Sequence, residues 1–201
     1  MLIAFVALYL VATVAIGLWA ARRVHNARDY VVAGRSLPLY MSTALVFATW
    51  FGAETVLGVS ATYLKEGMRG IVADPFGFSF CLVIIALFFA RAFYRLNLLT
   101  IGDFYRGRYN KTVEVATSIC ITLSYLGWVA AQLTALGVVF HTLSAGAIPL
   151  GWGIALATGV VLLYTLFGGM WSVAYTDVLQ SVIIIVGLLY LAFLLGGAAG
   201  A

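Results

Sequence analysis

Six long apolar stretches, separated by short polar segments, constrain what this chain can fold into more than any other feature. They cover residues 2–21, 39–63, 71–90, 113–140, 150–167 and 178–197. An α-helix needs about 20 mostly apolar residues to cross a bilayer, and none of the stretches alternates as a lipid-facing strand does. With 64% hydrophobic and 9% charged residues, the chain cannot cover a soluble fold with polar groups. The sequence therefore predicts an all-α integral membrane protein with about six transmembrane helices.

Charged residues and cysteines argue against several other classes of protein. The net charge of +4 comes from residues spread over short loops, which disfavours nucleic acid as a partner. Cys81 and Cys120 lie inside apolar stretches, so we expect neither a disulfide framework nor a metal-ligand spacing. No His-Glu-x-x-His motif, Ser/Lys pair or pair of aspartates at membrane depth is present, so we expect no enzyme and no cofactor. The first stretch lacks a convincing cleavage site and is expected to remain as a helix.

Basic residues are distributed unequally between the predicted loops. Nine of the eleven follow the first and third stretches, and two follow the second. The nine are Arg22, Arg23, Arg28, Arg35, Arg91, Arg95, Arg106, Arg108 and Lys111, and the two are Lys65 and Arg69. Because cytoplasmic loops are enriched in Lys and Arg, the loops after the first, third and fifth stretches are predicted to be cytoplasmic and the N-terminus outside. The expected location is the plasma membrane, which is the inner membrane in a Gram-negative bacterium.

The second stretch contains a carboxylate near its middle. Glu54 lies between Gly52 and Gly58, and a carboxylate at that depth is costly unless it faces protein, water or a ligand. Gly52 also permits the helix to unwind, and freed carbonyls can then coordinate a small cation. The alternative is that the two glycines only allow close helix packing.

Polar residues occur in two further apolar stretches. Gln132 lies near the centre of the fourth stretch, where it can bind a substrate or form a helix–helix hydrogen bond. Between the fifth and sixth stretches, Gly168-Gly169 precedes a polar face that includes Thr176, Asp177 and Gln180. A functional site and a simple helix cap at Thr176 or Asp177 are equally compatible with this pattern.

Three segments resemble the motifs of one membrane protein family. Residues 29–37 resemble Asp-Tyr/Phe-x-x-Ala-Gly-Arg; residues 99–109 resemble Thr-x-x-Glu-Phe/Tyr-x-x-x-Arg-Tyr/Phe, with Asp103 in place of Glu; residues 168–180 carry Gly-Gly followed by Thr-Asp-x-x-Gln. In this order, and all on the predicted cytoplasmic side, they are similar to the sodium:solute symporters, which include bacterial proline, pantothenate and sugar symporters.

This resemblance implies the LeuT-type inverted-repeat fold in a single membrane domain over residues 1–201. Residues 1–38 would form an extra N-terminal helix and a cytoplasmic loop, and residues 39–201 the first five-helix repeat. The outside N-terminus deduced from the loop charges agrees with the family. A second five-helix repeat is then expected, either in a longer chain or in a partner chain, because alternating access needs one repeat to move against another.

The resemblance also implies site residues. In the family the broken first core helix lends backbone carbonyls to sodium, and these positions fall on Ala48 and Phe51. Side chains just past the break contact the solute, which indicates Glu54 and Thr55. The signature aspartate, Asp177, is linked in some members to a further sodium site or to the inner ion exit.

The function implied is sodium-coupled symport of a small polar organic solute, with Na⁺ as the coupling ion and the bilayer as surroundings. One alternative is a symporter-like membrane module of a sensor histidine kinase. Another is a truncated fragment that does not transport.

Overall fold

The computed structural model describes residues 2–199, and every regular element in that range is helical. The α-helices are α1 (Leu2–Ala20), α2 (Ala27–Val32), α3 (Leu39–Trp50), α4 (Ser60–Glu66), α5 (Phe78–Ile84), α6 (Ala90–Arg95), α7 (Ile101–Arg108), α8 (Lys111–Leu143) and α9 (Leu150–Ala199). Short 3-10 helices are η1 (Ala21–Arg23), η2 (Ala33–Arg35) and η4 (Gly67–Arg69), and π-helical segments are η3 (Glu54–Val59), η5 (Val72–Gly77) and η6 (Ile85–Phe89).

The helices form two compact units. One contains the chain up to Trp50, residues Leu143–Ala147 and the chain from Ala155 onward. The other contains Phe51–Thr142 and Ile148–Ile154. The second apolar stretch is not a single continuous helix, because α3 ends at Trp50 and Phe51 and Gly52 are non-helical.

Among the described residues, four helices are long and apolar enough to cross a membrane. They are Ile3–Arg23, Val72–Arg95, Lys111–Leu143 and Leu150–Gly197. A fifth results if Ala27–Arg35 and Leu39–Trp50 count as one broken span. The chain bends by 106° between these two segments. The first, third and fourth predicted spans thus coincide with single helical stretches. The second, predicted as one span over 39–63, is interrupted after Trp50.

The predicted fifth and sixth spans are the two limbs of α9. A straight helix over Leu150–Ala199 would be about 75 Å long, more than twice the thickness of a bilayer core. Gly169 breaks it with φ 48° and ψ −138°, a conformation that is essentially restricted to glycine. The second limb therefore begins directly after Gly169. The sequence-based prediction, which started this span at residue 178, is wrong at this boundary.

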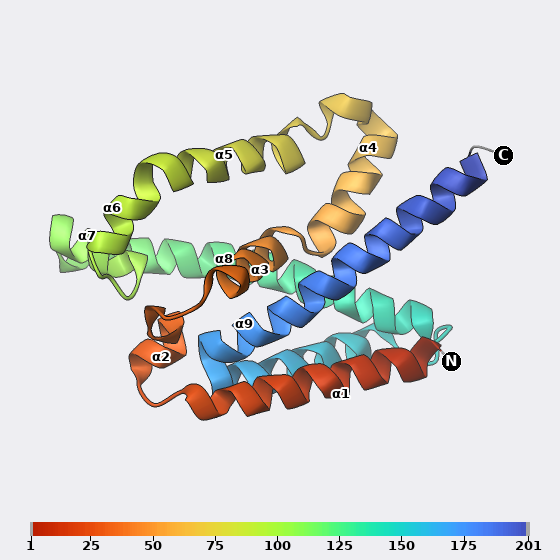
Figure 1. The fold of residues 1–201 in the computed structure, drawn as a ribbon, viewed down its shortest axis with the longest axis horizontal. Coiled ribbons are helices and arrows are strands. Elements are labelled where there is room, and N and C mark those ends of the chain that lie inside the picture. Colours follow the sequence, from red (N-terminus) through yellow and green to blue (C-terminus); the bar gives the residue numbers. More distant parts are fainter. Residues whose placement is uncertain (1, 200–201) are drawn as a thin grey trace. The chain divides into compact units, whose positions relative to one another are not determined.

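The first unit holds most of the buried side chains. In Figure 1, α1 runs beside the first limb of α9, and the two approach closely at Gly17, where an added Cβ would lie 2.6 Å from Cβ of Tyr164. The buried side chains are Ala20, Ala33, Met41, Ala157, Trp171 and Ala174, with the polar Thr13, Ser172, Thr176 and Ser181 among them. Buried hydroxyls are normally hydrogen-bonded, and all four of these donate to backbone carbonyls.

In the second unit, capping residues fix where the segments on the predicted cytoplasmic side begin. Thr100 accepts a hydrogen bond from the backbone N–H of Asp103, and the Asp103 carboxylate accepts one from the N–H of Thr100 at 2.8 Å. This capping box starts α7, and the same backbone bond lowers the pKa of Asp103 from its ordinary value. An edge-on contact between Phe93 and Phe104, with ring centroids 5.5 Å apart, holds α7 against α6. Asp103, at the position where the motif that this segment resembles carries Glu, therefore completes the cap.

Candidate functional site

The chain leaves the α-helical path directly after α3. Phe51 and Gly52 are non-helical, and the helix resumes with a bond from the N–H of Val56 to the carbonyl of Gly52 at 3.1 Å. The helix is thus interrupted at Gly52, and unwinding there is one of the two roles that the sequence left open for this glycine. Ala48 lies in the last turn of α3 and Phe51 in the break itself. Carbonyls in the last turn of a helix, where Ala48 lies, lack the regular donors of that helix.

Gln132 stabilises the start of the resumed helix. Its Oε1 atom accepts a hydrogen bond from the backbone N–H of Ala53 at 3.3 Å, across 79 positions of sequence. Gly52 permits this approach, because an added Cβ would lie 3.2 Å from Nε2 and 3.3 Å from Oε1 of Gln132. Gln132 thus makes the helix–helix hydrogen bond that was one of its two expected roles.

Thr55 contacts a carboxylate that the sequence analysis missed. Its hydroxyl donates to Oδ2 of Asp74 at 3.3 Å. Asp74 has extended backbone dihedrals, φ −127° and ψ 122°, within η5 and directly precedes Pro75. The available signal was an Asp-Pro pair at the start of an apolar stretch, which reads as an ordinary loop-to-helix boundary. Both side chains are half-buried.

Glu54 is exposed in the described structure, and its Cγ runs along η3 toward Gly58, where an added Cβ would be 3.8 Å away. In the second unit the resumed helix thus carries Glu54 and Thr55 as sequence neighbours, with Asp74 bonded to Thr55 and Gln132 bonded to the N–H of Ala53. This set is rich in acceptors and suits a ligand that carries positive charge or several hydroxyl groups.

The signature segment lies in the first unit. Ser172 is fully buried and donates to the carbonyl of Gly17 on α1. Thr176 is also buried, and its hydroxyl donates to the carbonyls of Ser172 at 3.0 Å and Val173 at 2.9 Å in its own helix. Both bonds lie inside the second limb of α9. The proposal that Thr176 or Asp177 caps the start of a helix is therefore wrong, because both lie about two turns after the break at Gly169.

Asp177 is half-buried in this limb and lies within electrostatic reach of the phenols of Tyr9 and Tyr164. One turn further, Ser181 donates to the carbonyl of Ala44 on α3 at 3.3 Å. That bond joins the signature limb to α3 one turn before Ala48. Sequence analysis did not find Ser181 because a lone serine in an apolar helix carries no distinctive signal.

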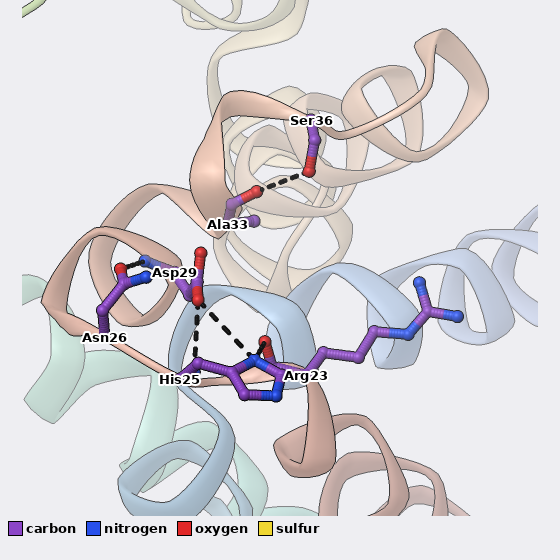
Figure 2. Close-up of polar contacts among 6 residues, drawn as sticks. All are labelled: Arg23, His25, Asn26, Asp29, Ala33 and Ser36. Atoms are coloured by element: carbon purple, nitrogen blue, oxygen red, sulfur yellow. Dashed lines mark hydrogen bonds and ion pairs between the residues drawn. The ribbon is translucent and has the colours of Figure 1, made fainter.

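The first family-like motif, residues 29–37, lies in a segment whose polar groups form hydrogen bonds with one another (Figure 2). Asp29 accepts from the backbone N–H of His25 at 3.1 Å, and its own N–H donates to the Asn26 side chain at 2.9 Å. Ser36 donates to the carbonyl of Ala33 at 3.0 Å. The acidic residue of the motif is thus structural: it fixes the start of α2 after the predicted first span.

Comparison with known proteins places these features in one family. A model of the sodium:solute symporter family matches residues 30–200. The human high affinity choline transporter 1 is 30% identical over 195 residues, covering 93% of this chain and 33% of its own length. The Vibrio parahaemolyticus sodium/glucose cotransporter is 27% identical over 186 residues, covering 90% of this chain and 34% of its own.

The Drosophila melanogaster high-affinity choline transporter 1 is 29% identical over 187 residues, covering 91% of this chain and 30% of its own length. The chain thus spans about a third of the length of the curated relatives that it matches. No solved structure matches it significantly. The extent of the family match, over most of the described residues, shows that the chain belongs to the sodium:solute symporter family.

Proposed function

We propose that this chain is the N-terminal part of a symporter that couples the inward movement of Na⁺ to uptake of a small polar organic solute. The observation that carries the proposal is the break after α3, which is followed at once by Glu54 and Thr55 in a resumed helix that Gln132 and Asp74 contact at Ala53 and Thr55. Broken helices with nearby polar groups are how transporters build ion and solute sites within the bilayer. The transporter relatives do not favour the sensory alternative.

The architecture proposed is the LeuT-type fold with six spans and an outside N-terminus in the plasma membrane. Residues 1–38 form the extra helix and loop, and residues 39–201 the first five-helix repeat. The break directly after α3 and the two limbs of α9 support this architecture. A second repeat, in the same chain or a partner, completes the transporter.

The coupling ion is proposed to bind backbone carbonyls of Ala48 and Phe51, with Asp177 on a second site or on the inner ion exit. Sodium is a hard cation that prefers oxygen ligands, and all three positions offer them. Each Na⁺ that moves inward down a 100 mV potential contributes about 2.3 kcal/mol. That energy is available to concentrate the solute.

The solute is proposed to contact Glu54, Thr55 and Gln132, and the position of Asp74 adds a second carboxylate to this group. Two carboxylates favour an organic cation, and the same acceptors also suit a polyol. The relatives named as choline transporters and as a sodium/glucose cotransporter handle solutes of these two kinds.

The test is solute uptake by the full-length natural protein in proteoliposomes, with choline, glucose and proline as labelled solutes. We expect uptake of one solute that needs external Na⁺ and is lost when K⁺ replaces it. Glu54→Gln should reduce this uptake at least ten-fold, which corresponds to about 1.4 kcal/mol. Glu66→Gln, an exposed glutamate at the end of α4, is the control and should leave uptake unchanged. Equal uptake in Na⁺ and K⁺ would refute the coupling.

A further inference from the structure

Two family-like motifs that lie far apart in the sequence contact each other in the first unit. Tyr30 in α2 packs against the break in α9. A Cβ added at Gly169 would lie 2.4 Å from the carbonyl oxygen of Tyr30 and 2.8 Å from Cδ2 of its ring. Because Gly169 also has φ 48°, neither the backbone nor the available space admits a side chain there. Tyr30 therefore occupies the space where a side chain at position 169 would lie.

The hydroxyl of Tyr30 also bonds the first limb of α9. It donates to the carbonyl of Thr165 at 3.2 Å, across 135 positions of sequence. Thr165 lies in the last turn before the break, where helix carbonyls lose their regular partners. One side chain thus caps the end of the first limb and occupies the space beside Gly169.

A second contact holds the start of the other limb. The guanidinium of Arg23 lies over the rings of Trp19, Trp171 and Tyr175, at 5.6, 5.2 and 5.1 Å from their centroids. Trp19 belongs to α1, whereas Trp171 and Tyr175 belong to the first turns of the second limb. Cation–π contacts of this kind attract within about 6 Å of a ring centroid. Both limbs are therefore attached, on either side of Gly169, to α1 and the loop that follows it.

We propose that Tyr30 is a positioning residue that sets the angle between the two limbs of α9 and thereby the place of Asp177. Asp177 lies about two turns beyond the break, so a rotation at Gly169 displaces its carboxylate. The ion-binding part of this inference rests on the proposed function, whereas the angle between the limbs does not. Loss of Tyr30 leaves the limbs free to sample several angles, and only some of them place Asp177 correctly for a cation.

The angle can be measured in the full-length protein by pulsed electron paramagnetic resonance. Spin labels at Leu162→Cys and Val186→Cys, which are 50% and 60% exposed, lie on the two limbs. Cys81 and Cys120 are exposed and are replaced by serine to prevent labelling elsewhere. We expect one narrow distance distribution in otherwise native protein, and a broadened or displaced one in Tyr30→Ala. Tyr40→Ala, at a phenol that is 63% exposed on α3, is the control and should match the native distribution.

Transport supplies the second measurement. Tyr30→Phe removes only the hydroxyl, and loss of one hydrogen bond changes an equilibrium by about five-fold. Because an ion site that is correctly arranged only part of the time binds with lower apparent affinity, the Na⁺ half-saturation constant should rise by up to about five-fold at saturating solute. A merely structural role would lower the amount of active protein and the maximal rate, but would not move this constant.

An unchanged distance distribution in Tyr30→Ala overturns the proposal, as does an equal rise of the Na⁺ constant in Tyr40→Phe. If native uptake proves independent of Na⁺ while Tyr30→Ala still broadens the distribution, the proposed function fails. In that case the positioning of α9 by Tyr30 stands.

Discussion

The contact between Gly52 and Gln132 predicts a specific effect of adding one methyl group. In Gly52→Ala the new Cβ would lie 3.2 Å from Nε2 and 3.3 Å from Oε1 of Gln132, closer than such atoms pack comfortably. The flexible amide yields most easily, and a movement of a few tenths of an ångström lengthens its bond to the N–H of Ala53, already 3.3 Å. We expect Gly52→Ala to lose most of this bond, about 1 kcal/mol.

Hydrogen exchange at the backbone amide of Ala53 reports this bond directly. A loss of about 1 kcal/mol should speed exchange in peptides that contain Ala53 by about five-fold. Gln132→Ala should give the same acceleration because it removes the acceptor. The double variant should then be no faster than either single one, since both changes remove a single interaction.

The matched control is the glycine at the other side of Glu54. In Gly58→Ala the added Cβ would lie 3.8 Å from Cγ of Glu54, an ordinary contact, so exchange at Ala53 should not change. Native exchange rates in Gly52→Ala, or accelerations that multiply to about 25-fold in its combination with Gln132→Ala, would refute the reasoning.

Three further predictions concern other parts of the chain. Asp74→Asn removes the negative charge of the carboxylate that accepts a hydrogen bond from Thr55. The KM for a cationic solute in Na⁺-driven uptake should then rise at least five-fold, or about 1 kcal/mol. An unchanged KM for such a solute would contradict a role of Asp74 in binding. Ser172→Ala removes the buried hydroxyl that donates to a carbonyl on α1, and should destabilise the protein by about 1–3 kcal/mol in thermal unfolding. Thr122→Ala removes an exposed hydroxyl that donates to a carbonyl of its own helix, and should have little effect. Equal effects of the two variants would count against a stabilising role of the buried hydrogen bond. Because the pKa of Asp103 is lowered in the folded protein, its carboxylate stabilises α7 at pH values above the ordinary pKa of 3.8, and this stabilisation is lost as the pH falls through the lowered pKa. Asp103→Ala should therefore weaken the protection of α7 from hydrogen exchange at pH 6 but not in strong acid. A difference in protection that persists in strong acid would exclude the charged cap as its cause.

The sequence predicts the uninterrupted membrane helices well. The predicted stretch 2–21 corresponds to α1 over Leu2–Ala20, and 113–140 lies within α8 over Lys111–Leu143. Hydrophobic length determines both, and a helix in lipid has few alternatives because all its backbone groups must be paired internally.

Helix breaks and contacts between distant segments were harder to predict from the sequence. Unwinding at Gly52 was one of two readings of the sequence, suggested by a glycine beside a carboxylate in an apolar stretch. The start of the last helix was misplaced by several residues because one positive φ at Gly169 does not alter hydropathy. The contact of Thr55 with Asp74 and the packing of Tyr30 on Gly169 depend on tertiary structure, which no local pattern encodes.

The central claim is that a sodium gradient drives the solute inward, and accumulation tests it most directly. Proteoliposomes that contain the full-length protein would be loaded with the same concentration of labelled solute inside and outside, then given an inward Na⁺ gradient. We predict that the internal concentration rises above the external one and falls back when an ionophore collapses the gradient. Solute concentrations that remain equal under the Na⁺ gradient, in protein that still carries the solute across, would contradict the account.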